Sequence, residues 1–164
     1  MRQFYLYYYD SIYGENILEH HSLLPENWWN YVGVQNNSII TGMNCVDTVV
    51  NRVHSENYSH HIERLMIIGN YVLLMAYNPV SVNRWFMEMY TDAFEWVVTP
   101  NVMAMSQYSD GGRLATKPYI SGGNYIEKMS DYCLNCQYSI KDKTCPMTHL
   151  YWDFIYRNQP IFKK

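Results

Sequence analysis

Three of the four cysteines lie close together in the last third of the chain, and cysteine thiolates are ligands for soft metals. Cys133 and Cys136 form a Cys-x-x-Cys pair. Cys145 follows nine positions after the pair and directly precedes Pro146. A loop can gather three such thiolates around one centre. Cys45 stands far upstream and could supply a fourth ligand once the chain folds back.

Four thiolates suit two kinds of centre, tetrahedral zinc and a 4Fe-4S cluster. Zinc sites more often consist of two Cys-x-x-Cys knuckles, whereas a Cys-Pro ligand with one remote cysteine favours iron–sulfur. The alternative is that Cys45 is a buried core thiol, as free cysteines often are. Residue types alone therefore indicate a metal centre and leave its identity open.

A glycine-rich polar stretch precedes these cysteines. Gly111-Gly112 and Gly122-Gly123 let backbone amides approach an anion closely. The stretch matches neither a P-loop nor the dinucleotide-binding fingerprint. It therefore predicts loops with only a non-specific capacity to bind anions.

A few polar residues fall where apolar ones are expected. His60 and His61 open a helical pattern, with His61 in its apolar stripe. Adjacent side chains point about 100° apart on a helix, so at most one of the two faces the core. Asp92 is expected between two tryptophans on a buried face, where a carboxylate needs a partner such as Arg64 or Arg113. Taken one by one, these residues are more simply explained as structural.

The pattern of apolar residues predicts an all-α fold. Helices are expected over about residues 44–53, 58–77, 81–98 and 148–157, with loops and short helical pieces between 101 and 131. The prolines after Asn78 and Thr99 are expected to end the second and third of these helices, and Ser81 to cap the third. No segment shows sustained alternation of apolar and polar residues, so no sheet is expected.

Length and composition bound the class of protein. The chain has 164 residues, 48% of them hydrophobic, and is expected to be one domain with a partly irregular first segment (1–44) and a helical portion (45–164). Its 12 basic and 15 acidic residues give a net charge of -3, which argues against independent affinity for nucleic acid. No apolar run could span a bilayer and no secretory signal is present, so we expect an intracellular, cytoplasmic protein without a membrane partner.

Several segments together resemble the iron–sulfur bacterial cryptochromes and prokaryotic (6-4) photolyases. The segments are HHIERLMIIGN, WFMEMYTDAFEWVVTPNVMAMS, DGGRLATKPYISGGNYIEKMSDYCLNC and CPMTHLYWDFIYRN. The match runs almost without gaps from about residue 42 to 158, and the four cysteines fall where this family places its cluster ligands. The earlier pieces RQF and LPENWW resemble the region just upstream.

The resemblance implies the C-terminal helical part of a photolyase or cryptochrome FAD-binding catalytic domain with a four-cysteine cluster site. Its cofactors would be FAD and a 4Fe-4S cluster, with zinc the lesser alternative. Photolyases of this family use light-excited reduced flavin to donate an electron to a (6-4) lesion, which is flipped out of UV-damaged DNA.

The resemblance also implies roles for individual residues. The cluster would be held by Cys45, Cys133, Cys136 and Cys145, and the flavin would be surrounded by Asp92, Asn101, Lys117 and Tyr119. His60 and His61 would line the lesion side of the flavin, with His61 the better candidate for protonating the lesion. Trp85 would belong to the chain of aromatic residues that passes electrons to photoexcited FAD.

The chain also departs from the family. Family members are far longer and carry an N-terminal α/β antenna domain and further FAD-binding helices. An insertion lies between LPENWW and GMNC, where the family has a tryptophan. We therefore expect the chain to act with a separately encoded N-terminal photolyase half. The alternatives are a non-enzymatic truncated remnant, stabilised by a metal or cluster and lacking flavin, and a gene fragment without a stable product.

Overall fold

A computed structural model describes residues 2–29 and 41–162, and every regular element within them is helical. The α-helices are α1 (Arg2–Ile12), α2 (Asn44–Glu56), α3 (His61–Glu63), α4 (Asn70–Leu74), α5 (Pro79–Met89), α6 (Glu95–Thr99), α7 (Gly123–Met129), α8 (Pro146–Arg157) and α9 (Gln159–Phe162). Two 3-10 helices, η1 (Glu26–Trp28) and η4 (Tyr132–Asn135), and two π-helices, η2 (Arg64–Gly69) and η3 (Pro100–Ser106), complete the set. The expected all-α fold is confirmed.

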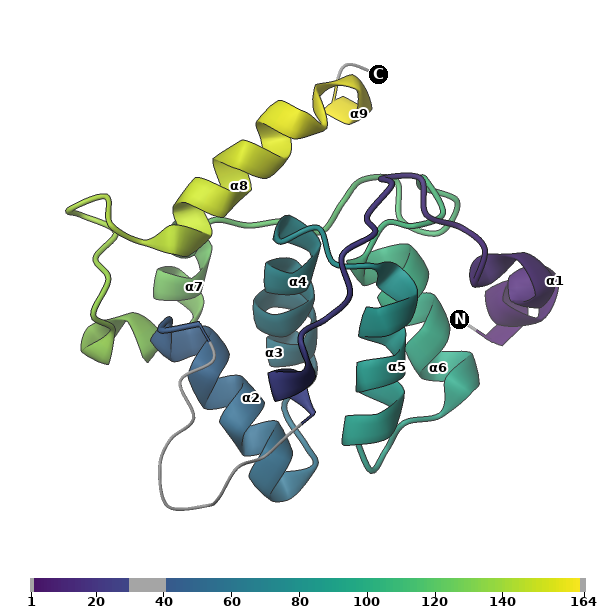
Figure 1. Ribbon diagram of the computed structural model, residues 1–164, viewed down its shortest axis with the longest axis horizontal. Helices are drawn as coiled ribbons and strands as arrows, with labels where there is room; N and C mark the ends of the chain where they lie inside the picture. The colour runs from purple at the N-terminus through teal and green to yellow at the C-terminus, as the bar shows by residue number, and fades with distance from the viewer. Residues whose placement is uncertain (1, 30–40, 163–164) are drawn as a thin grey trace.

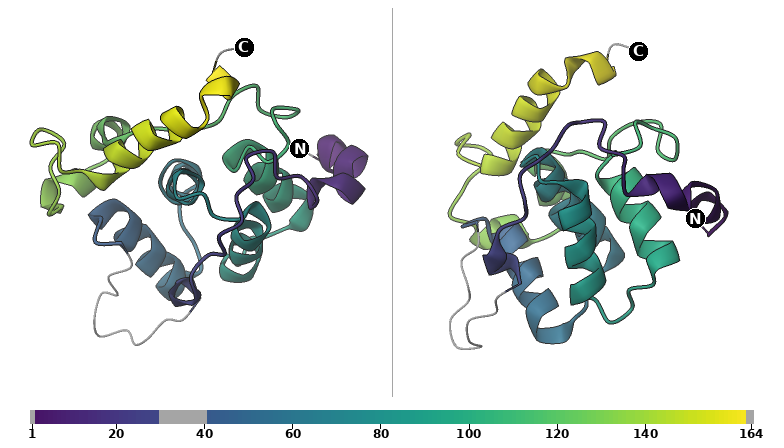
Figure 2. Two further views of the ribbon diagram at one scale, coloured as in Figure 1. Left: turned by 45° about the horizontal axis from the view of Figure 1, so that its top comes forward. Right: turned by 45° about the vertical axis from the view of Figure 1, so that its right-hand side comes forward.

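The helices form a row, and one further helix packs across an end of that row. Helices α2, α3–α4, α5 and α6 stand side by side, and α1 lies against α6 at the edge of the row (Figure 1). Helix α8 crosses the end of the row where α4 finishes, as the turned views show (Figure 2). No helix among the described residues is long and apolar enough to cross a membrane.

The core is built from one face of each central helix. In α2 the valines at 46, 49, 50 and 53 are fully buried, at the spacing that places residues on one side of a helix. Burial of each valine stabilises the fold by about 1.5 kcal/mol or more. The helix ends at Asn57, which adopts the left-handed conformation (φ 51°) and donates its N–H to Val53 O. The predicted helix over 44–53 is confirmed.

The second predicted helix is shorter than expected and changes its winding. It begins at His61, because the His60 side chain accepts the Ile62 N–H (3.2 Å) and the Glu63 carboxylate accepts the His60 N–H (3.0 Å). The π-helix η2 then widens the turn, so the predicted stripe is buried only at its far end, while His61 is exposed.

The prediction of one helix over 81–98 is wrong in three respects. Asn78 caps α5, with Pro79 in the first turn, and Ser81 instead accepts the Leu24 N–H. The helix ends at Met89 and a turn separates it from α6. Pro100 does not stop the chain's helical path, because the wide turn of η3 begins there and leaves room around the ring.

The described part of the first segment begins with a helix and continues as irregular chain. It holds α1, then η1 within an otherwise irregular stretch up to residue 29. The expected insertion before residue 42 lies largely outside the described residues. The boundary drawn at residue 44 stays a prediction.

Candidate functional site

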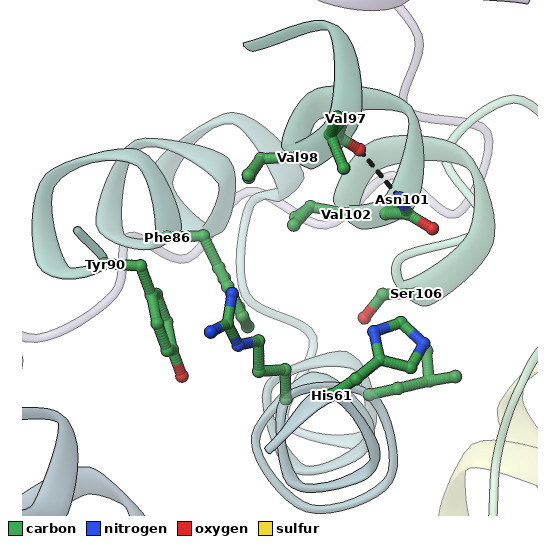
Figure 3. A pocket seen from close by; sticks show the side chains of 10 residues that line it. His61, Phe86, Tyr90, Val97, Val98, Asn101, Val102 and Ser106 are labelled. Carbon is green, nitrogen blue, oxygen red and sulfur yellow. Dashed lines mark hydrogen bonds between the residues drawn. The ribbon is translucent and has the colours of Figure 1, made fainter. Parts of the chain in front are cut away.

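A cavity opens between the start of the central helical run and the layer formed by α5, α6 and η3 (Figure 3). We call it the interhelical cavity. Its volume is about 80 Å³, below the roughly 300–1,000 Å³ that is typical of small-molecule sites. Its apolar wall consists of Leu65, Phe86, Tyr90, Val97, Val98 and Val102, and its polar groups belong to His61, Arg64, Asn101 and Ser106.

Arg64 is the charged group of this cavity and is held on several sides. Its guanidinium forms a bidentate ion pair with Asp92 (2.9 and 3.0 Å), and its Nε donates to Ser59 O (2.9 Å). The guanidinium carbon also lies 4.1 Å from the Tyr90 ring centroid and 5.1 Å from that of Tyr58. The arginine therefore presents a fixed positive charge to the cavity.

The expectation that Asp92 lies on a buried face between two tryptophans is wrong. Asp92 lies in the turn after α5, and its side chain is 49% exposed. It does not line the cavity and reaches it only through Arg64, one of the two predicted partners. The other, Arg113, pairs with Glu15 instead.

His61 and Asn101 come together at the cavity. His61 lies beside Ser106 at one end, across from Phe86 and Tyr90 (Figure 3). Asn101 Nδ2 donates to Val97 O (2.7 Å), so the amide offers its oxygen as an acceptor to a ligand. The site thus combines a flat aromatic wall with an acceptor, a positive charge and an imidazole.

Trp85 is fully buried directly behind the cavity wall. Its ring centroid lies 5.2 Å from that of Phe86 and 5.9 Å from that of Tyr90, both of which line the cavity. On its other side, the ring lies 5.3 Å from Trp28, and Trp85 Nε1 donates to Trp28 O (2.8 Å). Trp28 was not predicted as part of the site, although the LPENWW segment contains it.

Lys117 and Tyr119 are not brought to the interhelical cavity. Both side chains are exposed in the irregular stretch between η3 and α7, and neither contributes to the cavity lining. His60 lies just outside as well, on a neighbouring groove that it shares with Glu63 and Tyr132.

The four cysteines converge on a second, smaller cavity, which we call the cysteine cavity. Cys45 lies in the first turn of α2, and Cys133 in η4. Cys136 follows η4 directly, and Cys145 precedes the first residue of α8. All four line one narrow space of about 10 Å³, and none forms a disulfide.

The cysteine cavity has features suited to sulfur ligands. Burial raises the pKa of Cys45 to about 12 and also raises that of Cys133, so both are thiols at neutral pH when no metal is bound. A Cβ on Gly123 would lie 2.8 Å from Cys145 Sγ, so this glycine allows the close approach of the sulfur. Across residues 2–29 and 41–162, no group of three His, Cys, Asp or Glu side chains is compact enough to hold one metal ion.

Glu63 links a residue beside the interhelical cavity to a residue beside the cysteine cavity. The sequence predicted no role for it. Its carboxylate accepts hydrogen bonds from Arg52 Nη1 (2.7 Å), the Tyr132 hydroxyl and the His60 N–H (3.0 Å). Burial alone would raise the pKa of Glu63, but the bonds from Tyr132 and Arg52 outweigh it and hold that pKa below its usual value. The capping pattern from His60 to Glu63 is the sequence signal that could have revealed this residue.

Comparison with known proteins gives the relationship. No family model matches the chain. A (6-4) photolyase from Agrobacterium fabrum (strain C58 / ATCC 33970) is 46% identical over 152 residues, which are 90% of this chain. The chain belongs to the prokaryotic photolyase/cryptochrome family. The alignment with the photolyase covers 90% of this chain. It therefore includes the middle of the chain, where residues 61 to 106 line the interhelical cavity.

The chain spans 28% of the length of that photolyase. A second relative is uncharacterized protein R855 from Acanthamoeba polyphaga mimivirus, 39% identical over 98 residues. This match covers 60% of the present chain and 76% of the viral protein. The all-helical structure agrees with the C-terminal helical part of a photolyase.

Proposed function

We propose that this chain is the FAD- and cluster-binding C-terminal part of a light-driven photolyase that repairs (6-4) lesions in UV-damaged DNA, or of a related blue-light cryptochrome. The observation that carries the proposal is the interhelical cavity, which gathers His61, Arg64 and Asn101 around a flat aromatic wall. The 46% identity to a (6-4) photolyase supports the choice of reaction.

The types of residue that line the interhelical cavity suit a flavin. Phe86 offers an apolar ring, and Asn101 offers an acceptor to a polar ring edge. Arg64, which covers the Tyr90 ring, offers a positive charge. FAD, when bound, would supply the photoexcitable electron donor. Asp92 would act by holding Arg64 in place. Lys117 and Tyr119, from the irregular stretch after η3, stay predicted flavin contacts.

Two further residues would serve the repair reaction. The exposed ring of His61 can hold a proton at the mouth of the cavity and deliver it to a lesion on which negative charge develops. His60, held as the helix cap, would orient this turn. The Trp85 ring fills the space behind the cavity wall and contacts the rings of Phe86 and Tyr90. These contacts would let Trp85 pass electrons toward the cavity.

We further propose that Cys45, Cys133, Cys136 and Cys145 hold a 4Fe-4S cluster. They are four thiols, the number and kind that such a cluster needs, and they surround one cavity. A single zinc ion, held by four sulfurs about 2.3 Å from it, is the alternative occupant. A bound cluster would join the first turn of α2 to the start of α8.

A partner is part of the proposal, because the interhelical cavity is open on one side and offers few polar groups to a flavin. We propose that a separately encoded N-terminal photolyase half completes the flavin site.

The proposal is tested by co-expressing the chain with a family N-terminal half and purifying the pair without oxygen. We expect flavin, iron and sulfide in fixed proportion to protein, and repair of (6-4) lesions in light. His61→Ala should lower the repair rate by about 100-fold or more while flavin content is unchanged. The matched control His21→Ala, at an exposed histidine that does not line the cavity, should repair normally. A pair that takes up no flavin would contradict the proposal.

The cysteine cavity favours one alternative function. All four of its cysteines lie within the described residues, so its sulfur ligands need no contribution from a partner. A cluster-stabilised helical module without flavin would therefore contain iron and sulfide alone. Its stability against urea would fall on chelation of iron, and it would repair no lesions in any combination of partners.

A further inference from the structure

One carboxylate, Glu63, joins the turn that carries His60 and His61 to the segment that carries Cys133. Its Oε1 accepts from Arg52 and from the hydroxyl of Tyr132, the residue directly before Cys133. Its Oε2 accepts the backbone N–H of His60 (3.0 Å). The two oxygens of one side chain therefore bind two different segments.

The link continues toward the remote cysteine. Asn44 Nδ2 donates to the backbone carbonyl of Tyr132 (2.8 Å), and Asn44 is the neighbour of Cys45. The Glu63 side chain is only 14% exposed, so its hydrogen bonds are little weakened by water. An uninterrupted path of hydrogen bonds thus leads from both sides of the cysteine cavity to the cap of the central helix.

We infer that Glu63 is a positioning residue that transmits the state of the cysteine cavity to the His60–His61 turn. Filling the cysteine cavity fixes Tyr132, Tyr132 fixes the Glu63 carboxylate, and the carboxylate fixes the His60 N–H and with it the start of the helix. The inference rests on the proposed function only where it concerns a bound cluster. The link itself is formed by residues of this chain alone.

Glu63→Gln breaks this link while almost preserving side-chain size. An amide has one acceptor oxygen and one NH2 group. Its oxygen can face Arg52 or the His60 N–H, but not both, because the NH2 group then meets the other of these two groups, and neither can accept a hydrogen bond. The variant should therefore keep each segment folded and uncouple them.

The first test uses the full chain without metal and follows hydrogen exchange of the His60 and Ile62 amides by NMR. Tyr132→Phe removes only the hydroxyl that donates to Glu63. We expect about fivefold faster exchange at both amides, the change that loss of one hydrogen bond produces. Tyr138→Phe, at another tyrosine of the cysteine cavity, is the matched control and should leave both amides unchanged. Equal exchange in Tyr132→Phe and the unmodified chain would overturn the inference.

The second test loads the chain with iron and sulfide under anaerobic conditions. In the unmodified chain, loading should slow exchange by about fivefold in residues 132–145 and also in residues 60–63. In Glu63→Gln only residues 132–145 should respond. Glu88→Gln, which removes the charge of another ion-paired glutamate, should behave like the unmodified chain. Slowed exchange at 60–63 in Glu63→Gln would overturn the inference.

The two tests separate the inference from the proposed function. If iron and sulfide do not load into the unmodified chain, the cluster proposal is contradicted, and the Tyr132→Phe comparison still decides whether Glu63 forms the link. If loading succeeds and residues 60–63 do not respond, the cluster proposal stands and the inference is wrong.

Discussion

Arg64→Ala is expected to destabilise the fold by about 2–3 kcal/mol, far more than an ordinary surface arginine. The bidentate pair with half-exposed Asp92 contributes about 0.5–1 kcal/mol, because water screens it. The contact with the Tyr90 ring contributes about 1 kcal/mol, and the hydrogen bond to the carbonyl of fully buried Ser59 about as much. Most of the stabilisation thus comes from contacts other than the salt bridge.

Two comparisons make this magnitude testable by urea unfolding at constant pH. Asp92→Asn removes only the charge pair and should cost about 1 kcal/mol or less. Arg84→Ala is the matched control, since Arg84 pairs with Glu88 and lies 5.9 Å from the Trp29 ring but has a 72% exposed side chain. It should cost about 0.5 kcal/mol. If Arg64→Ala costs no more than either of these variants, the assignment of energy to the stacked, desolvated guanidinium is refuted.

Three further outcomes are expected. Gly69→Ala should cost about 1–3 kcal/mol in urea unfolding, because its Cβ would overlap Ser106 Oγ where η2 meets η3, and a neutral effect would exclude so close a contact. Burial lowers the pKa of His20 to about 4 from its usual 6.5, so its contribution to stability is complete above about pH 6.5 and is lost as pH falls toward 4. His20→Gln should therefore remove about 2 kcal/mol of the acid-induced loss in unfolding free energy, whereas His21→Gln at the exposed neighbour should not. Cys133→Ala should abolish iron binding and destabilise the C-terminal third, and unchanged iron content in the purified variant would contradict the cluster assignment.

The features predicted correctly from sequence are those that depend on local pattern. Helix α2 follows from valines at helical spacing and α8 from an amphipathic run after Pro146. The meeting of the cysteines was predicted from their order along the chain and from the family resemblance, and all four line one cavity. Their part in cluster binding, like the other residue roles, stays a prediction.

The failures arise where tertiary contacts or unusual winding override that pattern. Helical spacing placed Asp92 on a buried face, but the chain leaves the helix at Met89 and the carboxylate turns out to solvent toward Arg64. Proline at position 100 normally indicates a helix end, and a wide turn accommodates it here. Glu63 was overlooked because its partners Arg52 and Tyr132 are distant in sequence and meet it only after folding.

The paired wide turns at η2 and η3 make the cavity sensitive to insertions and deletions. Both face the cavity, through Arg64 and Leu65 on one side and Asn101, Val102 and Ser106 on the other. A π-helix closes its hydrogen bonds over one more residue than an α-helix does, so loss of a single residue within η2 or η3 would restore ordinary winding and remove the wide turn from the cavity wall. Mutational libraries that change residue identity should therefore preserve this wall far more often than libraries that change its length.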